Sequence, residues 1–271
     1  MRRLGQTPFS FPDFKGGTRR LVLVNLAAYF LLLLLQLAFP SGAGELTRRL
    51  AFIPSDFLSG ALWQPITYSL IHPTLMSTLF DLLSLWFLAS FLEANHGANW
   101  VIWLYSIAVL GTALAAAAIY IVSGTLDAGV PQAALYGCMG GVFGLLIAIG
   151  VLYGDTEFLM FFLVGIKAKY LAAIYALIAI AMLFSEQRMY AFAELGGGLA
   201  GLLYIKLAPR RGISFFFSES VYGLRNRYYR WKRRRAARKF EVYMRKQGRT
   251  VRFDGQGRLI DEDQDDKKRW N

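Results

Sequence analysis

Six apolar runs in this sequence are as long, or nearly as long, as a helix that crosses a bilayer. Such a span needs about 20 consecutive, mostly apolar residues. We place the runs at about residues 21–39, 74–93, 99–122, 135–153, 168–184 and 189–207. Because 55% of all residues are hydrophobic and the mean hydropathy is +0.38, an ordinary soluble domain is not expected. The sequence therefore predicts an all-α protein with six transmembrane helices.

Positive charge is concentrated after the last apolar run. Residues 208–271 carry 19 Lys and Arg against 8 Asp and Glu, a net charge of +11 out of the chain's +12. Since Lys and Arg accumulate in cytoplasmic segments, and six spans return the chain to its starting side, both termini are expected in the cytoplasm. The predicted organisation is a cytoplasmic N-terminal segment (1–20), a membrane domain (21–207) and a basic cytoplasmic tail (208–271).

The segment at 40–72, between the first two apolar runs, is too rich in apolar and aromatic residues for a solvated loop. Trp63 and Tyr68 belong to it, and such side chains favour the level of the lipid headgroups. We expect a structured element that lies partly in the membrane interface. A plain extracytoplasmic loop is the alternative.

Two glycine clusters predict a close approach of two helices. The first is LYGCMGGVFGLL (135–146) and the second is AELGGGLAGLLY (193–204). Glycine in a membrane helix lets a neighbouring backbone come near, so these two helices are expected to face each other. Packing inside one subunit is the favoured interpretation, and dimerisation through Gly-x-x-x-Gly is the alternative. The second cluster also places an ionisable residue, Glu194, inside an apolar run.

Three stretches of the chain resemble the rhomboid intramembrane serine proteases. They are LWQPITYSLIHPTLMSTLFDLLSLWFLASFLEANHG (62–97), YGCMGGVFGLL (136–146) and AELGGGLAGLLY (193–204). The second is similar to the family's Gly-x-Ser-Gly-x-x-Phe-Gly, and the third to its Ala-His-x-Gly-Gly-x-x-x-Gly. The residues that fall on the family's structural pattern are Trp63, Thr67, His72, Glu93, Gly97, Gly137, Gly140, Gly197 and Gly201. The resemblance covers about 62–205 and implies a six-helix rhomboid-type bundle.

The residues that carry proteolysis in that family are replaced in this chain. Met139 stands at the nucleophile position and Glu194 at the base position, while Ser77 and Asp81 stand at the oxyanion-hole positions. A thioether has no proton to lose and cannot form an acyl-enzyme. An ionised Asp81 would repel an oxyanion. Gln64 also replaces the family's loop arginine, so the resemblance implies a pseudoprotease without an intact catalytic site.

Some chemistry stays open at these positions. A dyad of Cys138 and Glu194 is an alternative nucleophile, although a residue next to Met139 on a helix points about 100° away from it. Asp81 and Glu194 are expected to share a proton or to hydrogen-bond to Ser77, since two carboxyls in a dehydrated cavity disfavour charge. His72 is expected to be structural. The single cysteine excludes a disulfide framework and a cysteine-based metal site, and no metal or cofactor is expected.

The leading functional expectation is binding without cleavage. The groove between the second and fifth helices would hold transmembrane segments of other membrane proteins. The alternatives are an active intramembrane serine-type endopeptidase and a membrane anchor that works through its tail. In the tail, Arg225–Lys239 interleaves basic and aromatic residues, which favours anionic lipid headgroups over nucleic acid. If the chain is bacterial, its membrane would be the inner membrane.

Overall fold

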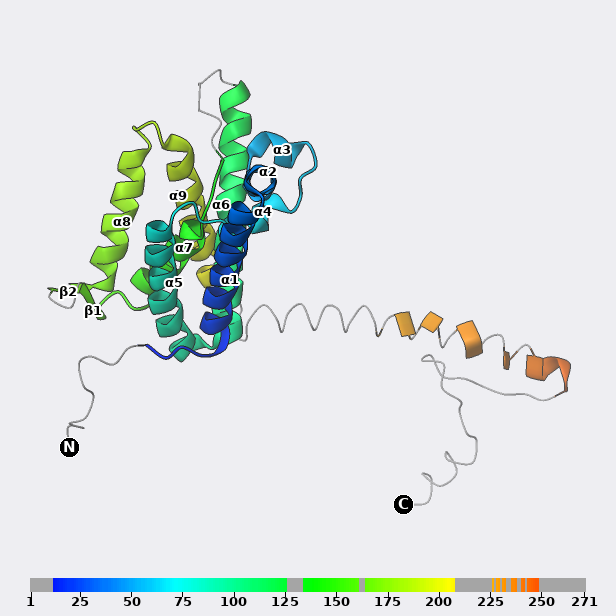
Figure 1. The fold of residues 1–271 in the computed structure, drawn as a ribbon. Helices are drawn as coiled ribbons and strands as arrows, with labels where there is room; N and C mark the ends of the chain where they lie inside the picture. The colour runs from blue at the N-terminus through cyan, green and yellow to red at the C-terminus, as the bar shows by residue number, and fades with distance from the viewer. Residues whose placement is uncertain are drawn as a thin grey trace, which may run out of the picture. The chain divides into compact units, whose positions relative to one another are not determined.

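The computed structural model describes residues 12–125, 134–160 and 164–207 and parts of 226–248. Those parts are residues 226, 228, 229, 231, 232, 235–237, 240, 241 and 243–248. The chain forms two compact units, Met1–Arg210 and Arg211–Asn271, and the named helices and strands belong to the first (Figure 1). Most of the N-terminal segment and much of the basic stretch Arg225–Lys239 lie outside the described residues, so the predictions for them stay predictions.

A helix lies at each of the six places where the sequence predicts one. These are α1 (Gly16–Ala38), α5 (Leu75–His96), α6 (Ala98–Thr125), α7 (Met139–Leu152), α8 (Ala168–Met182) and α9 (Arg188–Leu207). Within the described residues, three helices are long and apolar enough to cross a membrane, Gly16–Ala38, Leu75–His96 and Ala98–Gly124, while α7 and α8 are shorter apolar helices. The structure supports a protein with several transmembrane helices, and the number six stays a prediction.

Helix α7 begins four residues later than predicted. Leu135 forms an isolated antiparallel bridge with Phe52, so the backbone there is extended. Gly137 follows with a φ of 87°, a conformation that favours glycine. The helix therefore starts only at Met139, the residue that the rhomboid resemblance sets at the nucleophile position.

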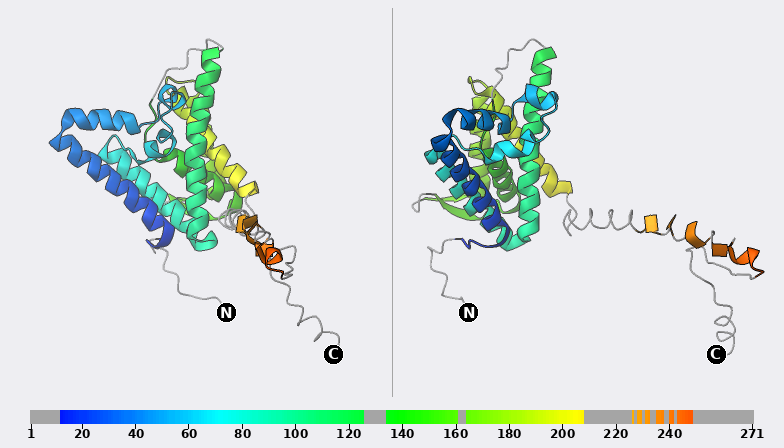
Figure 2. Two further views of the ribbon diagram at one scale, coloured as in Figure 1. Left: turned by 90° about the vertical axis from the view of Figure 1, so that its right-hand side faces the viewer. Right: turned by 45° about the vertical axis from the view of Figure 1, so that its right-hand side comes forward.

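Helices α6, α7 and α9 form the tightly packed part of the bundle, and α1 packs against α5 (Figures 1 and 2). A Cβ added to Gly201 would lie 3.0 Å from the Cα of Gly144, and one added to Gly197 would lie 2.7 Å from the carbonyl oxygen of Gly140. Both distances are shorter than ordinary contacts, so glycine is needed for this approach. The prediction that the two glycine clusters face each other within one subunit is confirmed.

The segment between α1 and α5 is structured, as predicted. It contains α2 (Pro40–Leu50), α3 (Pro54–Leu58), α4 (Gln64–Thr67) and the 3-10 helix η1 (Tyr68–Leu70). Tyr68 ties it to the bundle, because its hydroxyl donates to the carbonyl oxygen of Val109 (2.8 Å) and its carbonyl accepts from the backbone of Gly137 (3.1 Å). The segment therefore braces the start of α7, and its depth in the membrane stays a prediction.

The connection between α7 and α8 is a β-hairpin that the sequence analysis did not predict. Strands β1 (Glu157–Met160) and β2 (Val164–Lys167) pair antiparallel, with Glu157 opposite Lys167 and Met160 opposite Val164. Asp155 accepts a hydrogen bond from Lys169 (2.7 Å) beside the hairpin. This neighbouring ammonium holds the pKa of the Asp155 carboxyl below its usual value. The hairpin and this exposed ion pair hold the start of α8.

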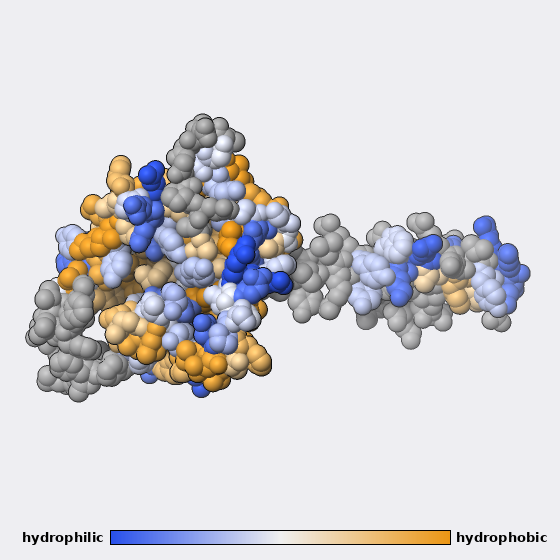
Figure 3. Space-filling model, turned by 45° about the horizontal axis from the view of Figure 1, so that its top comes forward, coloured by the Kyte–Doolittle hydropathy of each residue, from blue (hydrophilic) through white to orange (hydrophobic). Residues whose placement is uncertain are grey.

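Large apolar side chains remain exposed on the bundle surface (Figure 3). On α1 and α8, Leu34, Leu37 and Leu177 expose 62%, 74% and 67% of their surface. Such exposure is costly in water but costs nothing in contact with lipid chains. The surface is therefore the one that a membrane-embedded bundle requires.

Candidate functional site

A cavity of about 660 Å³ lies between α5, α7, α8 and α9. Its lining is almost entirely apolar and comes mainly from α5 and α8. The lining residues are Phe80, Leu83, Ser84, Phe87, Leu88, Met139, Val142, Phe143, Leu146, Phe158, Leu171, Tyr175, Ile178, Ala179, Met182 and Glu194. The structure thus brings the family's nucleophile and base positions, Met139 and Glu194, to one cavity. Tyr175 lines the same space.

Ser77 and Asp81 are placed differently from the prediction. Among the described residues that line the cavity, neither is present. Ser77 is exposed and belongs to the start of α5, where its hydroxyl donates to the carbonyl oxygen of Thr74 (3.0 Å) and accepts from the Thr74 hydroxyl (2.9 Å). Its hydroxyl therefore serves the helix terminus rather than a carboxyl. A proton shared between Asp81 and Glu194 stays a prediction.

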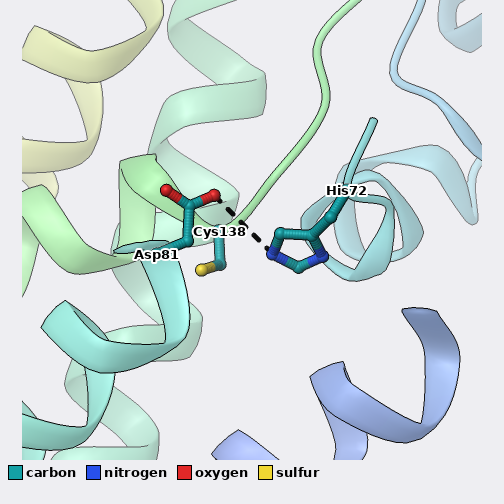
Figure 4. Close-up of side chains that lie close together, drawn as sticks. All are labelled: His72, Asp81 and Cys138. Carbon is teal, nitrogen blue, oxygen red and sulfur yellow. Dashed lines mark ion pairs between the residues drawn. The ribbon is translucent and has the colours of Figure 1, made fainter. Parts of the chain in front are cut away.

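Asp81 lies beside His72 and Cys138 (Figure 4). The Nε2 atom of His72 lies 3.7 Å from Oδ2 of Asp81, and the three potential donor atoms all lie within 4.8 Å of one another. His72 precedes α5, and its side chain is fully buried. Burial lowers the pKa of the His72 imidazole. A neutral imidazole wedged between loop and helix agrees with a structural role.

Cys138 is not positioned as a nucleophile. It is the residue before α7, it is completely buried, and its sulfur lies within 4.8 Å of the donor atoms of His72 and Asp81. It is not among the described residues that line the cavity with Glu194. This cluster was not predicted, because the single cysteine was taken to exclude a metal site. The available signal was that the rhomboid resemblance grouped Asp81 with Met139, the neighbour of Cys138 in the chain.

The loop residues of the motif hold the segment before α5 together. Trp63 donates through Nε1 to the carbonyl oxygen of Arg49 (3.0 Å), and Thr67 donates to that of Leu50 (2.7 Å). Gln64 is buried, and its Oε1 accepts from the backbone of Ile53 (3.0 Å). The glutamine that replaces the family's arginine is therefore part of the loop's internal bonding.

Glu93 holds the start of α1, a role that the sequence did not predict, although Glu93 was recognised as part of a motif. Its carboxylate accepts from the backbone of Gly17 (2.9 Å) and from the backbone (2.7 Å) and hydroxyl (2.6 Å) of Thr18. These are orphan donors at the start of α1, where a negative charge is favoured. Gly97 then ends α5 with a φ of 85°. His96 is exposed and stacks on Trp100 with ring centroids 4.1 Å apart.

One family model matches this chain. It is described as a eukaryotic integral membrane protein family (DUF1751), and the match covers residues 19–211, well over half of the chain and all six long helices apart from the first three residues of α1. No curated protein matches the chain. The eukaryotic family argues against a bacterial inner membrane, and the orientation of the termini stays a prediction. The chain therefore belongs to the DUF1751 family of eukaryotic integral membrane proteins.

Proposed function

We propose that this chain is a rhomboid-like pseudoprotease that binds transmembrane segments of other membrane proteins in the cavity between α5 and α8. The observation that carries the proposal is the cavity itself, with a volume of about 660 Å³ and an apolar lining. Ligand sites are commonly apolar and concave, with few polar groups that fix orientation. Here those groups come from Ser84, Tyr175 and Glu194.

The occupant that fits this lining is an apolar helix that enters from the lipid. Helix α8 packs on α7 and α9, and the cavity separates it from α5. Ile178 lines the cavity and neighbours Leu177, which is exposed on the bundle surface. An apolar helix recognised in a groove places its side chains in such a space. A polar or charged partner would lose its hydration without gaining hydrogen bonds.

Binding without cleavage follows from the residues at the start of α7. Acyl transfer needs a nucleophile within reach of a base. Met139 has no ionisable proton, and Cys138 is buried behind it. Glu194 lines the cavity but has no hydroxyl or thiol facing it at the nucleophile position. The competing function is an endopeptidase, and an experiment can distinguish cleavage from binding alone.

The test measures binding of a fluorescent single-span apolar peptide to the full-length protein in lipid nanodiscs. In Ser84→Trp the indole fills part of the cavity, and we expect at least about tenfold weaker binding because several apolar contacts are lost. Leu33→Trp is the matched control, since Leu33 is an exposed residue of α1 outside the cavity lining. Equal binding by both variants would show that the peptide does not bind in the cavity. Peptide cleavage, or labelling by a fluorophosphonate reagent, would establish the endopeptidase instead.

A further inference from the structure

We propose that His72, Asp81 and Cys138 form a binding site for a divalent transition-metal ion, and that Zn²⁺ is the ion that fits these donors best. The three residues come from separate parts of the bundle. His72 precedes α5, Asp81 lies in its second turn, and Cys138 is the last residue before α7 (Figure 4). The site is distinct from the cavity, and the inference does not rest on the proposed function.

The spacing of the donor atoms is close to what a metal site requires. Zinc bonds of about 2.0–2.3 Å in a tetrahedral arrangement separate neighbouring donor atoms by roughly 3.3–3.7 Å. The distance between Nε2 of His72 and Oδ2 of Asp81 is 3.7 Å, and no pair among the three donor atoms exceeds 4.8 Å. Side-chain rotations of small amplitude close the remaining difference. The same 3.7 Å is too long for a direct hydrogen bond.

The imidazole of His72 supplies an observation that points to a ligand. Its side chain is fully buried, and within the described residues neither ring nitrogen has a hydrogen-bond partner. Buried polar atoms nearly always have a hydrogen-bond partner, so two buried ring nitrogens without one need an explanation. Figure 4 shows the ring turned toward Asp81, with Cys138 beside the carboxylate. A metal ion between these groups would give the Nε2 lone pair a partner.

Charge balance also favours a divalent cation. On binding of the ion the Cys138 thiol releases its proton to solvent, so that the thiolate and the Asp81 carboxylate together carry two negative charges. Both groups are largely withdrawn from water. A buried charge is stable only when it is paired or coordinates a metal. A divalent ion neutralises both at once, and the neutral imidazole adds no charge. The cluster then becomes electrically neutral at a depth where uncompensated charge is costly.

The donor set selects the ion. One sulfur, one nitrogen and one carboxylate oxygen suit Zn²⁺, whereas Mg²⁺ and Ca²⁺ prefer oxygen donors alone. Three protein ligands leave the fourth tetrahedral position open. The bound ion would connect the loop before α5, α5 itself and the start of α7, next to Met139. It would therefore fix the geometry of the end of the cavity at Met139 without lining the cavity.

The test is the metal content of the full-length protein, purified with a tag that binds no metal and measured by mass spectrometry after incubation with Zn²⁺ and dialysis. We expect about one tightly held Zn²⁺ per chain and at least about tenfold weaker binding in Cys138→Ser and His72→Gln. The controls are His96→Gln and Asp155→Asn, an exposed histidine and an exposed aspartate outside the cluster. These two variants should bind Zn²⁺ like the wild type.

Replacement by Co²⁺ gives a second measurement that needs no variant. Because Cys138 is the only cysteine of the chain, a thiolate-to-cobalt charge-transfer band in the near ultraviolet would identify it as a ligand. A wild-type protein that retains no Zn²⁺ and shows no such band with Co²⁺ would overturn the proposal. Equal metal content in the wild type and in folded Cys138→Ser and His72→Gln would overturn it as well.

Discussion

The two sides of α7 differ in how closely their neighbours approach. Toward α6 and α9, glycines bring backbones together, and a Cβ on Gly197 would lie 2.7 Å from the carbonyl oxygen of Gly140. Toward α5 and α8, side chains surround a cavity of about 660 Å³. One helix therefore carries a rigid contact on one face and an open space on the other. The rigid side positions Met139 and Glu194, and the open side leaves room for a partner.

The two outer helices differ in the same way. Helix α1 is fastened to α5 by the Glu93 carboxylate, which accepts three hydrogen bonds from Gly17 and Thr18. The start of α8 is fastened by the hairpin and by the ion pair of Asp155 and Lys169, whose side chains are 80% and 45% exposed. Exposed ion pairs contribute little to stability. Helix α8 is therefore the less firmly held of the two, and under the proposed function it is the one suited to move when a partner enters the cavity.

The largest effect is expected from breaking the rigid side. Gly197→Val places branched carbon atoms against the carbonyl oxygens of Gly140 and Ala108, which belong to helix backbones and cannot turn aside. Such overpacking should lower the free energy of unfolding by about 3 kcal/mol, measured by thermal unfolding in detergent. Gly44→Ala is the control, because nothing lies within 4 Å of its added Cβ. Equal melting temperatures for both variants would contradict the close packing of α6, α7 and α9.

A smaller loss is expected at the fastening of α1. Glu93→Gln removes the charge and leaves one oxygen to accept from three donors, so the unfolding free energy should fall by about 1–2 kcal/mol. Asp155→Asn removes an exposed acceptor from Lys169 and should leave the unfolding temperature unchanged within error. If Asp155→Asn were the more damaging of the two, α8 would be the firmly held helix, and the contrast between the outer helices would be reversed.

The open side should tolerate truncation. Met139→Ala shortens a half-buried side chain that borders existing empty space, so the expected cost is about 1 kcal/mol, below that of a fully buried methionine. The same variant should change the affinity for an apolar transmembrane peptide, because the cavity becomes wider at its end. Thermal unfolding and peptide binding in nanodiscs measure the two effects. A stability loss as large as that of Gly197→Val would show that Met139 is part of the rigid side.

The helices and their glycine contacts were predictable because they depend on local patterns. Long apolar runs have few structures open to them in a membrane, and glycine clusters have few uses other than close approach. The four-residue error at the start of α7 arose because Gly137 and the bridge at Leu135 interrupt an apolar run that looks continuous. The hairpin before α8 was missed because its short strands lie within an apolar stretch with no strong turn signal.

The site was only partly predictable because it depends on side-chain directions. The resemblance placed Met139 and Glu194 near each other, and both line the cavity. It also grouped Ser77 and Asp81 with them, although the first belongs to the start of α5 and the second faces His72. Residues four apart share a helix face, but neither capping nor contacts with a distant loop can be read from spacing.

The smallest effect is expected from removing the tail. Residues 211–271 form a compact unit separate from the helical one, and the residues of the cavity all belong to the first unit. Deleting 211–271 should therefore leave the unfolding temperature of the bundle and its affinity for the apolar peptide unchanged within error. Binding to nanodiscs with and without anionic lipid would show separately what the basic tail contributes. If the deletion abolished peptide binding, the cavity on the open side of α7 would not be sufficient for binding, and the tail would be required.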